Sequence, residues 1–189
     1  MVLTRQQEKA IFAKFNNSGL SSNDLKIGST EKTVLPKKIK PIQKSTVPYE
    51  TANRLFQDFL SKSNLEGFTF DPELNRGFNF KNLEDKKDYH KLFVQPTNSD
   101  NAVYTIALTN QLKLKDARQL QSNYEFVRGK GFRPMFGFFI EEDGNRFIDI
   151  AIPISGITKD EAIMLGKNYK QKSIVEIFKN GRSSLIFIE

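Results

Sequence analysis

The chain has 189 residues, of which 38% are hydrophobic, enough for one domain with its own core plus an extension. The absence of cysteine excludes disulfides, thiolate metal sites and cysteine nucleophiles. No apolar run approaches the ~20 residues that span a bilayer, and the first residues lack the apolar stretch of a signal peptide. We therefore expect a cytoplasmic protein that does not associate with membranes.

The net charge of +7 is concentrated near the N-terminus. Residues 1–48 carry nine basic and three acidic side chains, whereas residues 49–189 carry twenty and nineteen. This asymmetry is typical of a basic arm that meets a polyanion, although a solubilising tail or a segment that docks on a partner has the same composition. We divide the chain into a basic arm and linker, residues 1–47, and a single α+β domain, residues 48–189.

The first expected element is a short helix within the arm. Thr4 and Gln7 form a capping-box pattern ahead of an apolar stripe that includes Ile11 and Phe15. A helix of about 12 residues is marginal in water, so we expect this one to dock on the body of the protein or on a partner. Residues 16–47 read as a linker, because prolines interspersed with lysines favour an extended chain.

A second helix is expected from Pro48 to residue 63, where Leu55, Phe56 and other apolar residues recur at helical spacing. Residues 64–88 interleave glycine and proline with phenylalanine, which predicts short strands or an irregular covering segment. Within that segment, we interpret the run LEDKKD, residues 83–88, as a solvated turn.

The regular part of the domain is expected over residues 102–189. A strand at 102–109 and a helix at 115–131 precede two strands joined at DGN, the strongest hairpin signal in the chain. A capping box of Thr158 and Glu161 opens the next helix, and an Asn-Gly pair joins the last two strands. The order β-α-β-β-α-β-β predicts an α+β fold, with a mostly antiparallel sheet and helices on one face.

Catalytic chemistry is scarce in this sequence. The single histidine, His90, has no partner at a spacing typical of a metal site or a catalytic triad. Turn chemistry accounts for the acidic residues 141–143, so we expect neither a metal nor a cofactor. An enzyme remains a third hypothesis, and it would need a pocket that joins Asp149, Tyr169 and a lysine.

Two patterns resemble nucleotide-binding motifs without fitting them. The segment RGKGF, residues 128–132, follows a helix and precedes a strand, the reverse of the order in phosphate-binding loops, so helix capping explains its glycines. The element order is also that of RNA-recognition modules, which stack bases on aromatic side chains of two strands. Only Tyr104 and Phe147 fall at such places, which would make a poor platform.

The C-terminal part carries a family resemblance. Residues 155–174, SGITKDEAIMLGKNYKQKSI, fit the pattern G-I-x-x-x-E-A-x-x-L-G-K/R-x-Y/F-x-Q-x-S/A-I/V, and GKGFRPMFGFF, residues 129–139, fits a preceding hairpin region. In these residues the chain resembles an uncharacterised bacterial family, a domain of unknown function, over roughly 102–189. Gln111 stands where that family has proline. The resemblance implies a small α+β domain and brings no assigned activity.

From these observations we expect a non-enzymatic accessory protein that binds DNA or RNA through its basic arm. The basic side chains expected to contact phosphates are Lys37, Lys38, Lys40, Lys44, Arg128, Lys130 and Arg133. The alternative is a protein-interaction or assembly component, for example of a virus or a mobile element, in which residues 1–47 dock on a partner subunit. Apolar residues within the arm, such as Val34 and Ile39, favour this alternative.

Overall fold

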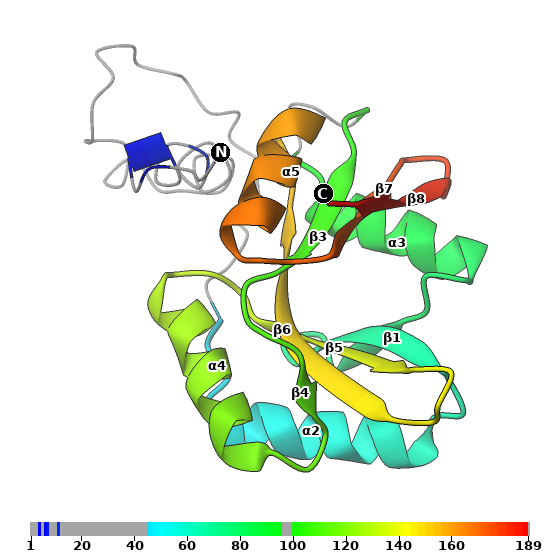
Figure 1. Cartoon of the computed structure of the whole chain (residues 1–189). Coiled ribbons are helices and arrows are strands. Elements are labelled where there is room, and N and C mark those ends of the chain that lie inside the picture. The colour runs from blue at the N-terminus through cyan, green and yellow to red at the C-terminus, as the bar shows by residue number, and fades with distance from the viewer. Residues whose placement is uncertain (1–3, 5, 8–10, 12–44, 96–99, 189) are drawn as a thin grey trace.

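The computed structural model describes residues 4, 6–7, 11, 45–95 and 100–188 of the chain. In this part, helices pack against one curled sheet (Figure 1). The elements in chain order are α2 (Tyr49–Lys62), β1 (Gly67–Asp71), β2 (Arg76–Phe78), α3 (Leu83–Phe93), β3 (Val103–Ala107), β4 (Leu112–Lys113), α4 (Ala117–Gly129), β5 (Met135–Ile140), β6 (Arg146–Ile154), α5 (Lys159–Asn168), β7 (Ser173–Ile177) and β8 (Ser183–Phe187).

The strands pair antiparallel in the order β2-β1-β5-β6-β3-β7-β8, and the short β4 pairs with β6. The hairpins β5–β6 and β7–β8 are those predicted from the DGN and Asn-Gly turns. In the second turn Gly181 has a φ of 83°, a left-handed conformation that favours glycine. The predicted α+β fold class is therefore confirmed, and the regular part of the sheet begins at Gly67, well before residue 102.

The larger hydrophobic core lies between one face of the sheet and the helices α2, α4 and α5. Side chains of a strand alternate between the two faces, so Phe136, Ile148 and Ile150 point into this core. Phe56 of α2 is fully buried and stacks on Phe136, with ring centroids 4.7 Å apart. Burying a side chain of this size stabilises the fold by about 1.5–3 kcal/mol, so this contact helps to hold α2 on the sheet.

Helix α3 covers part of the opposite face, and the sequence did not predict it. The interpretation of residues 83–88 as a solvated turn is wrong, because they form the first half of this helix. The Asn82 side chain accepts a hydrogen bond from the Asp85 N–H at the helix start, at 2.9 Å. Tyr89 and Phe93 then bury against Phe78 and Met135 in a second, smaller core.

Both predicted capping boxes are present. The backbone N–H of Glu161 donates to the Thr158 hydroxyl at 3.1 Å, and the Glu161 carboxylate accepts from the Thr158 N–H at 3.2 Å. Thr4 and Gln7 make the same reciprocal pair. Ile11 is 4% exposed and belongs to the larger core, whereas most of the helix expected at the start of the arm lies outside the described residues.

Among the helices that the structure describes, none combines the length and the apolar character that crossing a membrane requires.

Candidate functional site

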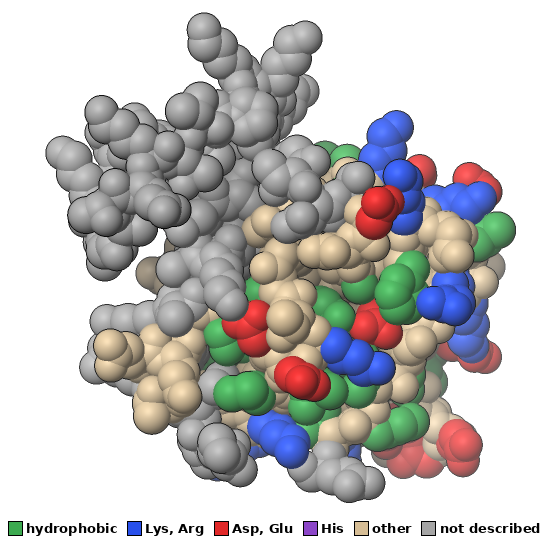
Figure 2. Space-filling view, turned by 90° about the horizontal axis from the view of Figure 1, so that it is seen from above, with side chains coloured by type: hydrophobic (Ala, Val, Ile, Leu, Met, Phe, Trp, Pro, Cys, Tyr) green, Lys and Arg blue, Asp and Glu red, His purple; other side chains and the backbone are tan. Residues whose placement is uncertain are grey.

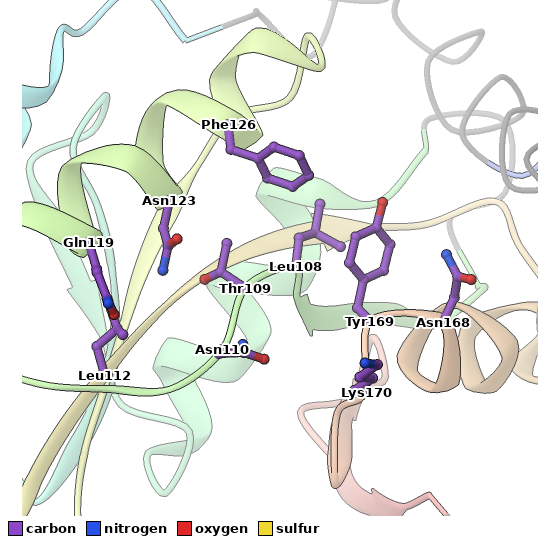
Figure 3. A pocket seen from close by; sticks show the side chains of 10 residues that line it. All are labelled: Leu108, Thr109, Asn110, Leu112, Gln119, Asn123, Phe126, Asn168, Tyr169 and Lys170. Atoms are coloured by element: carbon purple, nitrogen blue, oxygen red, sulfur yellow. The ribbon is translucent and has the colours of Figure 1, made fainter.

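A surface cleft of about 290 Å³ lies between α4 and the C-terminal end of α5. The connection from β3 to β4 forms its floor. Figure 3 shows Phe126 and Tyr169 on opposite walls, with Leu108 and Thr109 between them. The lining residues are Leu108, Thr109, Asn110, Leu112, Gln119, Asn123, Phe126, Asn168, Tyr169 and Lys170.

The spacing of residues along α4 explains its wall of the cleft. Leu120, Tyr124 and Val127 recur at helical spacing and are buried in the core. The residues one position before each of them, Gln119, Asn123 and Phe126, repeat the same spacing and so form a neighbouring stripe. This stripe lies at the edge of the buried face, where side chains border solvent, and it leaves the Phe126 ring 49% exposed.

The end of α5 is shaped so that it presents the opposite wall. Lys170 has a φ of 55°, and the N–H of Gln171 donates to the Gly166 carbonyl at 2.9 Å, the bonding pattern of a Schellman helix end. The Gln171 side-chain amide donates to the carbonyls of both Thr109, at 3.2 Å, and Tyr169, at 3.0 Å. One side chain thus ties the floor of the cleft to the wall formed by α5.

The floor is held by strand β6. The N–H of Leu108 donates to the Ile150 carbonyl at 3.0 Å, and the N–H of Ile150 donates to the Thr109 hydroxyl at 3.1 Å. Leu108 and Thr109 are both buried, whereas Asn110 is exposed. The cleft is therefore built on anchored backbone, so its shape is present before any ligand arrives.

The lining of the cleft is polar and carries few titratable groups. None of the ten lining residues is an Asp, Glu, His, Cys or Ser, and the titratable groups among them are Tyr169 and Lys170. The Lys130 ammonium lies over the Phe126 ring, 5.0 Å from its centroid, and brings a second cation to this side of α4. Four side-chain amides, which both donate and accept hydrogen bonds, complete the polar lining.

The basic side chains predicted to contact phosphates differ in where they lie in the structure. Lys37, Lys38, Lys40 and Lys44 lie outside the described residues. Arg128 is paired with Glu125 at 3.3 Å, one turn along α4, and Lys130 lies beside the cleft. Among the described side chains on the face seen in Figure 2, basic and acidic groups are interspersed, without a large area of one sign.

Arg133 serves the fold and is not a surface cation. Its guanidinium pairs with both carboxylate oxygens of Asp71, at 3.1 and 2.5 Å, and it lies over the Phe93 ring. The Arg133 side chain is only 13% exposed and Asp71 is fully buried. Because the two charges of this pair neutralise each other, Arg133 is not available to a phosphate group.

The arm joins the body beside α4. Glu73 accepts hydrogen bonds from the N–H groups of Thr46 and Val47, at 2.6 and 3.0 Å, and from the Ser45 hydroxyl at 2.9 Å. Burial alone would raise the pKa of Glu73, but these bonds outweigh it and lower that pKa below its usual value. The Tyr124 hydroxyl of α4 donates to the Val47 carbonyl at 2.7 Å, which anchors the junction against α4.

Asp149 lies on the face of the sheet opposite to the cleft. Its carboxyl group occupies the space beside Gly137, where any side chain would collide with it. Burial raises the pKa of Asp149 to about 7. Tyr169 packs against the larger core on the other face, so the pocket joining Asp149, Tyr169 and a lysine is not formed.

The remaining polar candidates also have structural roles. His90 is 2% exposed, and its Nε2 lies 2.7 Å from the Asn101 carbonyl. Within the described ranges, no three Asp, Glu or His side chains come together as metal ligands.

No family model matches the chain, and none of the curated proteins or solved structures matches it either. The resemblance of residues 102–189 to a bacterial family therefore stays a prediction.

Proposed function

We propose that this protein binds single-stranded DNA or RNA without modifying it, through the cleft between α4 and α5 together with the basic arm. The observation that carries the proposal is Phe126, a half-exposed aromatic ring on the wall of an amide-lined cleft, with the Lys130 cation over it. Exposed rings next to cations are the means by which proteins bind unpaired bases.

The side chains that line the cleft offer contacts for both the face and the edge of a nucleotide base. Phe126 and Tyr169 offer aromatic surface on opposite walls, on which a base can stack. The side chains of Asn110 and Asn123 can both donate to and accept from the edge of a base. Such edges are accessible in a single strand and engaged in a duplex, so the proposal specifies unpaired nucleic acid.

The size of the cleft favours one unit of a polymer over a complete small molecule. Its 290 Å³ lies at the lower limit of the ~300–1,000 Å³ that enclose a drug-sized ligand. Lys130 and Lys170 lie at the two walls, where the backbone of a strand would leave the cleft. Affinity for a longer strand then comes from further contacts outside the cleft.

The basic arm is the source of those further contacts in this proposal. Ser45, Thr46 and Val47 are anchored to Glu73 and to Tyr124 of α4, so the C-terminal end of the arm lies against the helix that bears Phe126. Lys37, Lys38, Lys40 and Lys44 precede this anchor in the sequence. They would neutralise phosphates without reading the bases, which adds affinity that depends on salt.

The substitution Phe126→Ala tests this proposal. Stacking on an aromatic side chain contributes about 1–3 kcal/mol per base, so we expect Kd for a fluorescein-labelled oligothymidine or oligouridine to rise roughly 5- to 150-fold. Fluorescence anisotropy with the full chain measures this change. Because Phe126 is half exposed on a helix where alanine is well accepted, thermal unfolding of the variant should stay close to that of the wild type.

The matched control is Leu92→Ala, which removes an apolar side chain of similar exposure, 45%, from α3 on the other side of the sheet. This variant should bind like the wild type. If the Phe126→Ala and Leu92→Ala variants bind the oligonucleotide equally well, the cleft is not the binding site. That result would favour the alternative, in which residues 1–47 dock on a partner subunit.

A further inference from the structure

The last strand of the sheet, β8, is an open edge with exposed apolar side chains. In the described part of the chain it pairs with β7 alone, and it is the final member of the strand order (Figure 1). Leu185 is 54% and Phe187 is 73% exposed, the two highest values among the large hydrophobic residues that the structure describes. Their cross-strand partners are Val175 and Ser173, and Val175 packs in the smaller core, so both side chains lie on the face that α3 partly covers.

The same residues direct their backbone groups outward. The N–H of Phe178 donates to the Arg182 carbonyl and the N–H of Ile188 donates to the Lys172 carbonyl. In an antiparallel ladder hydrogen-bonded pairs alternate with non-bonded pairs, so the register places Ser183, Leu185 and Phe187 at the non-bonded positions. Their N–H and C=O groups therefore point to the free edge.

The described residues protect the opposite edge of the sheet, whereas none of them covers β8 in the same way. Strand β2 is only three residues long, carries Arg76, and is adjacent to α3, whose Asp85 and Asp88 pair with that arginine. Short length, charge and a covering helix are the usual means of preventing edge-to-edge pairing. From Ser183 to Ile188, in contrast, the sequence SSLIFI contains no charged residue and no proline.

We propose that β8 pairs antiparallel with β8 of a second copy of this chain, about a two-fold axis at Leu185, and so forms a homodimer with a continuous sheet. The strand is its own complement about that axis. The outward groups of Ser183 would meet those of Phe187 in the partner copy, and Leu185 would face its own equivalent. A large residue thus lies opposite a small one at each end.

The surroundings of Ser183 complete the fit. Lys86 of α3 donates to the Ser183 hydroxyl at 3.2 Å, and Leu83, half exposed at the start of α3, lies against Gly181. Phe187 of the second copy would cover Ser183 and contact the apolar Leu83 and the Lys86 cation. A strand of an unrelated protein would carry a large aromatic residue opposite Ser183 only by chance, whereas β8 of a second copy always does. This favours a second copy as the occupant.

The test is sedimentation velocity of the full chain over a range of concentration up to about 1 mM. We expect a reversible increase from the 21.7 kDa monomer to twice that mass. Leu185→Lys places a charge next to its own equivalent across the axis, so it should raise the dimer dissociation constant by about tenfold or more. Leu92→Lys changes a leucine of similar exposure on α3 and should leave the dissociation constant unchanged.

A second variant examines the backbone. Leu185→Pro removes an N–H that points to the free edge and none that bonds to β7, so it should also weaken the dimer while circular dichroism stays that of the wild type. A wild-type chain that remains monomeric throughout the range overturns the proposal. So does a dimer that Leu185→Lys and Leu92→Lys affect equally.

Discussion

Replacing Arg133 with alanine is expected to lower the free energy of unfolding by about 3–5 kcal/mol, because it leaves Asp71 as a buried carboxyl group without its cation. Arg133→Lys should be intermediate, since lysine retains the charge but cannot bond both carboxylate oxygens at once. Chemical denaturation at neutral pH measures these differences.

The control for Arg133 is Arg128→Ala, which removes an arginine from a pair at the surface. Its partner Glu125 lies one turn away on the same helix, and both side chains reach solvent. The loss of stability should therefore stay below about 1 kcal/mol. A similar, small effect of both substitutions would contradict the structural role assigned to Arg133 and return it to the candidate phosphate contacts.

The substitution Asp149→Asn is expected to stabilise the protein at alkaline pH and to have little effect near pH 4. Burial raises the pKa of Asp149 from 3.8 to about 7, so between these values the folded state retains a proton that the unfolded state releases. Wild-type stability should then fall as pH rises through this window. Asparagine has no proton to lose, so its advantage should reach a few kcal/mol above pH 7, because one pKa unit corresponds to about 1.4 kcal/mol.

Denaturation curves at a series of pH values from 4 to 8 measure this difference, with Asp116→Asn as the control. Asp116 is exposed and makes no capping hydrogen bond at the start of α4, so its variant should follow the wild-type pH dependence. An Asp149→Asn variant that is less stable than the wild type at pH 8 would show that the charged carboxylate has a stabilising partner.

The parts of the fold that the sequence predicted well depend on neighbouring residues. Thr158 and Glu161 are three positions apart and form their capping box within one turn, and the turn at Gly181 needs only its own φ. Helix α3 was not predicted because its first half is charged. Tyr89 and Phe93, the side chains that pack it into the smaller core, come in its second half. A search for periodicity extended to residue 93 would have found them.

The role of Arg133 depends on a partner 62 positions away in the sequence, and no local pattern predicts such a pair. The position of Phe126 at the edge of the buried face could have been predicted from the sequence. Gln119, Asn123 and Phe126 repeat the spacing of the buried stripe one position earlier. The cleft itself also needs Tyr169 and the anchored floor at Thr109. These depend on the packing of α5 against β3 and β7, which only the folded sheet determines.

The most direct test of the central claim is the binding of the full chain to matched single-stranded and duplex oligonucleotides, followed by anisotropy over a series of salt concentrations. We expect the single strand to bind at least about tenfold more tightly, because only unpaired bases can enter the cleft. We also expect the affinity to fall as salt rises, because the arm neutralises phosphates. Absence of binding to either form at low salt, or equal binding to both, would overturn the proposed binding of unpaired bases in the cleft.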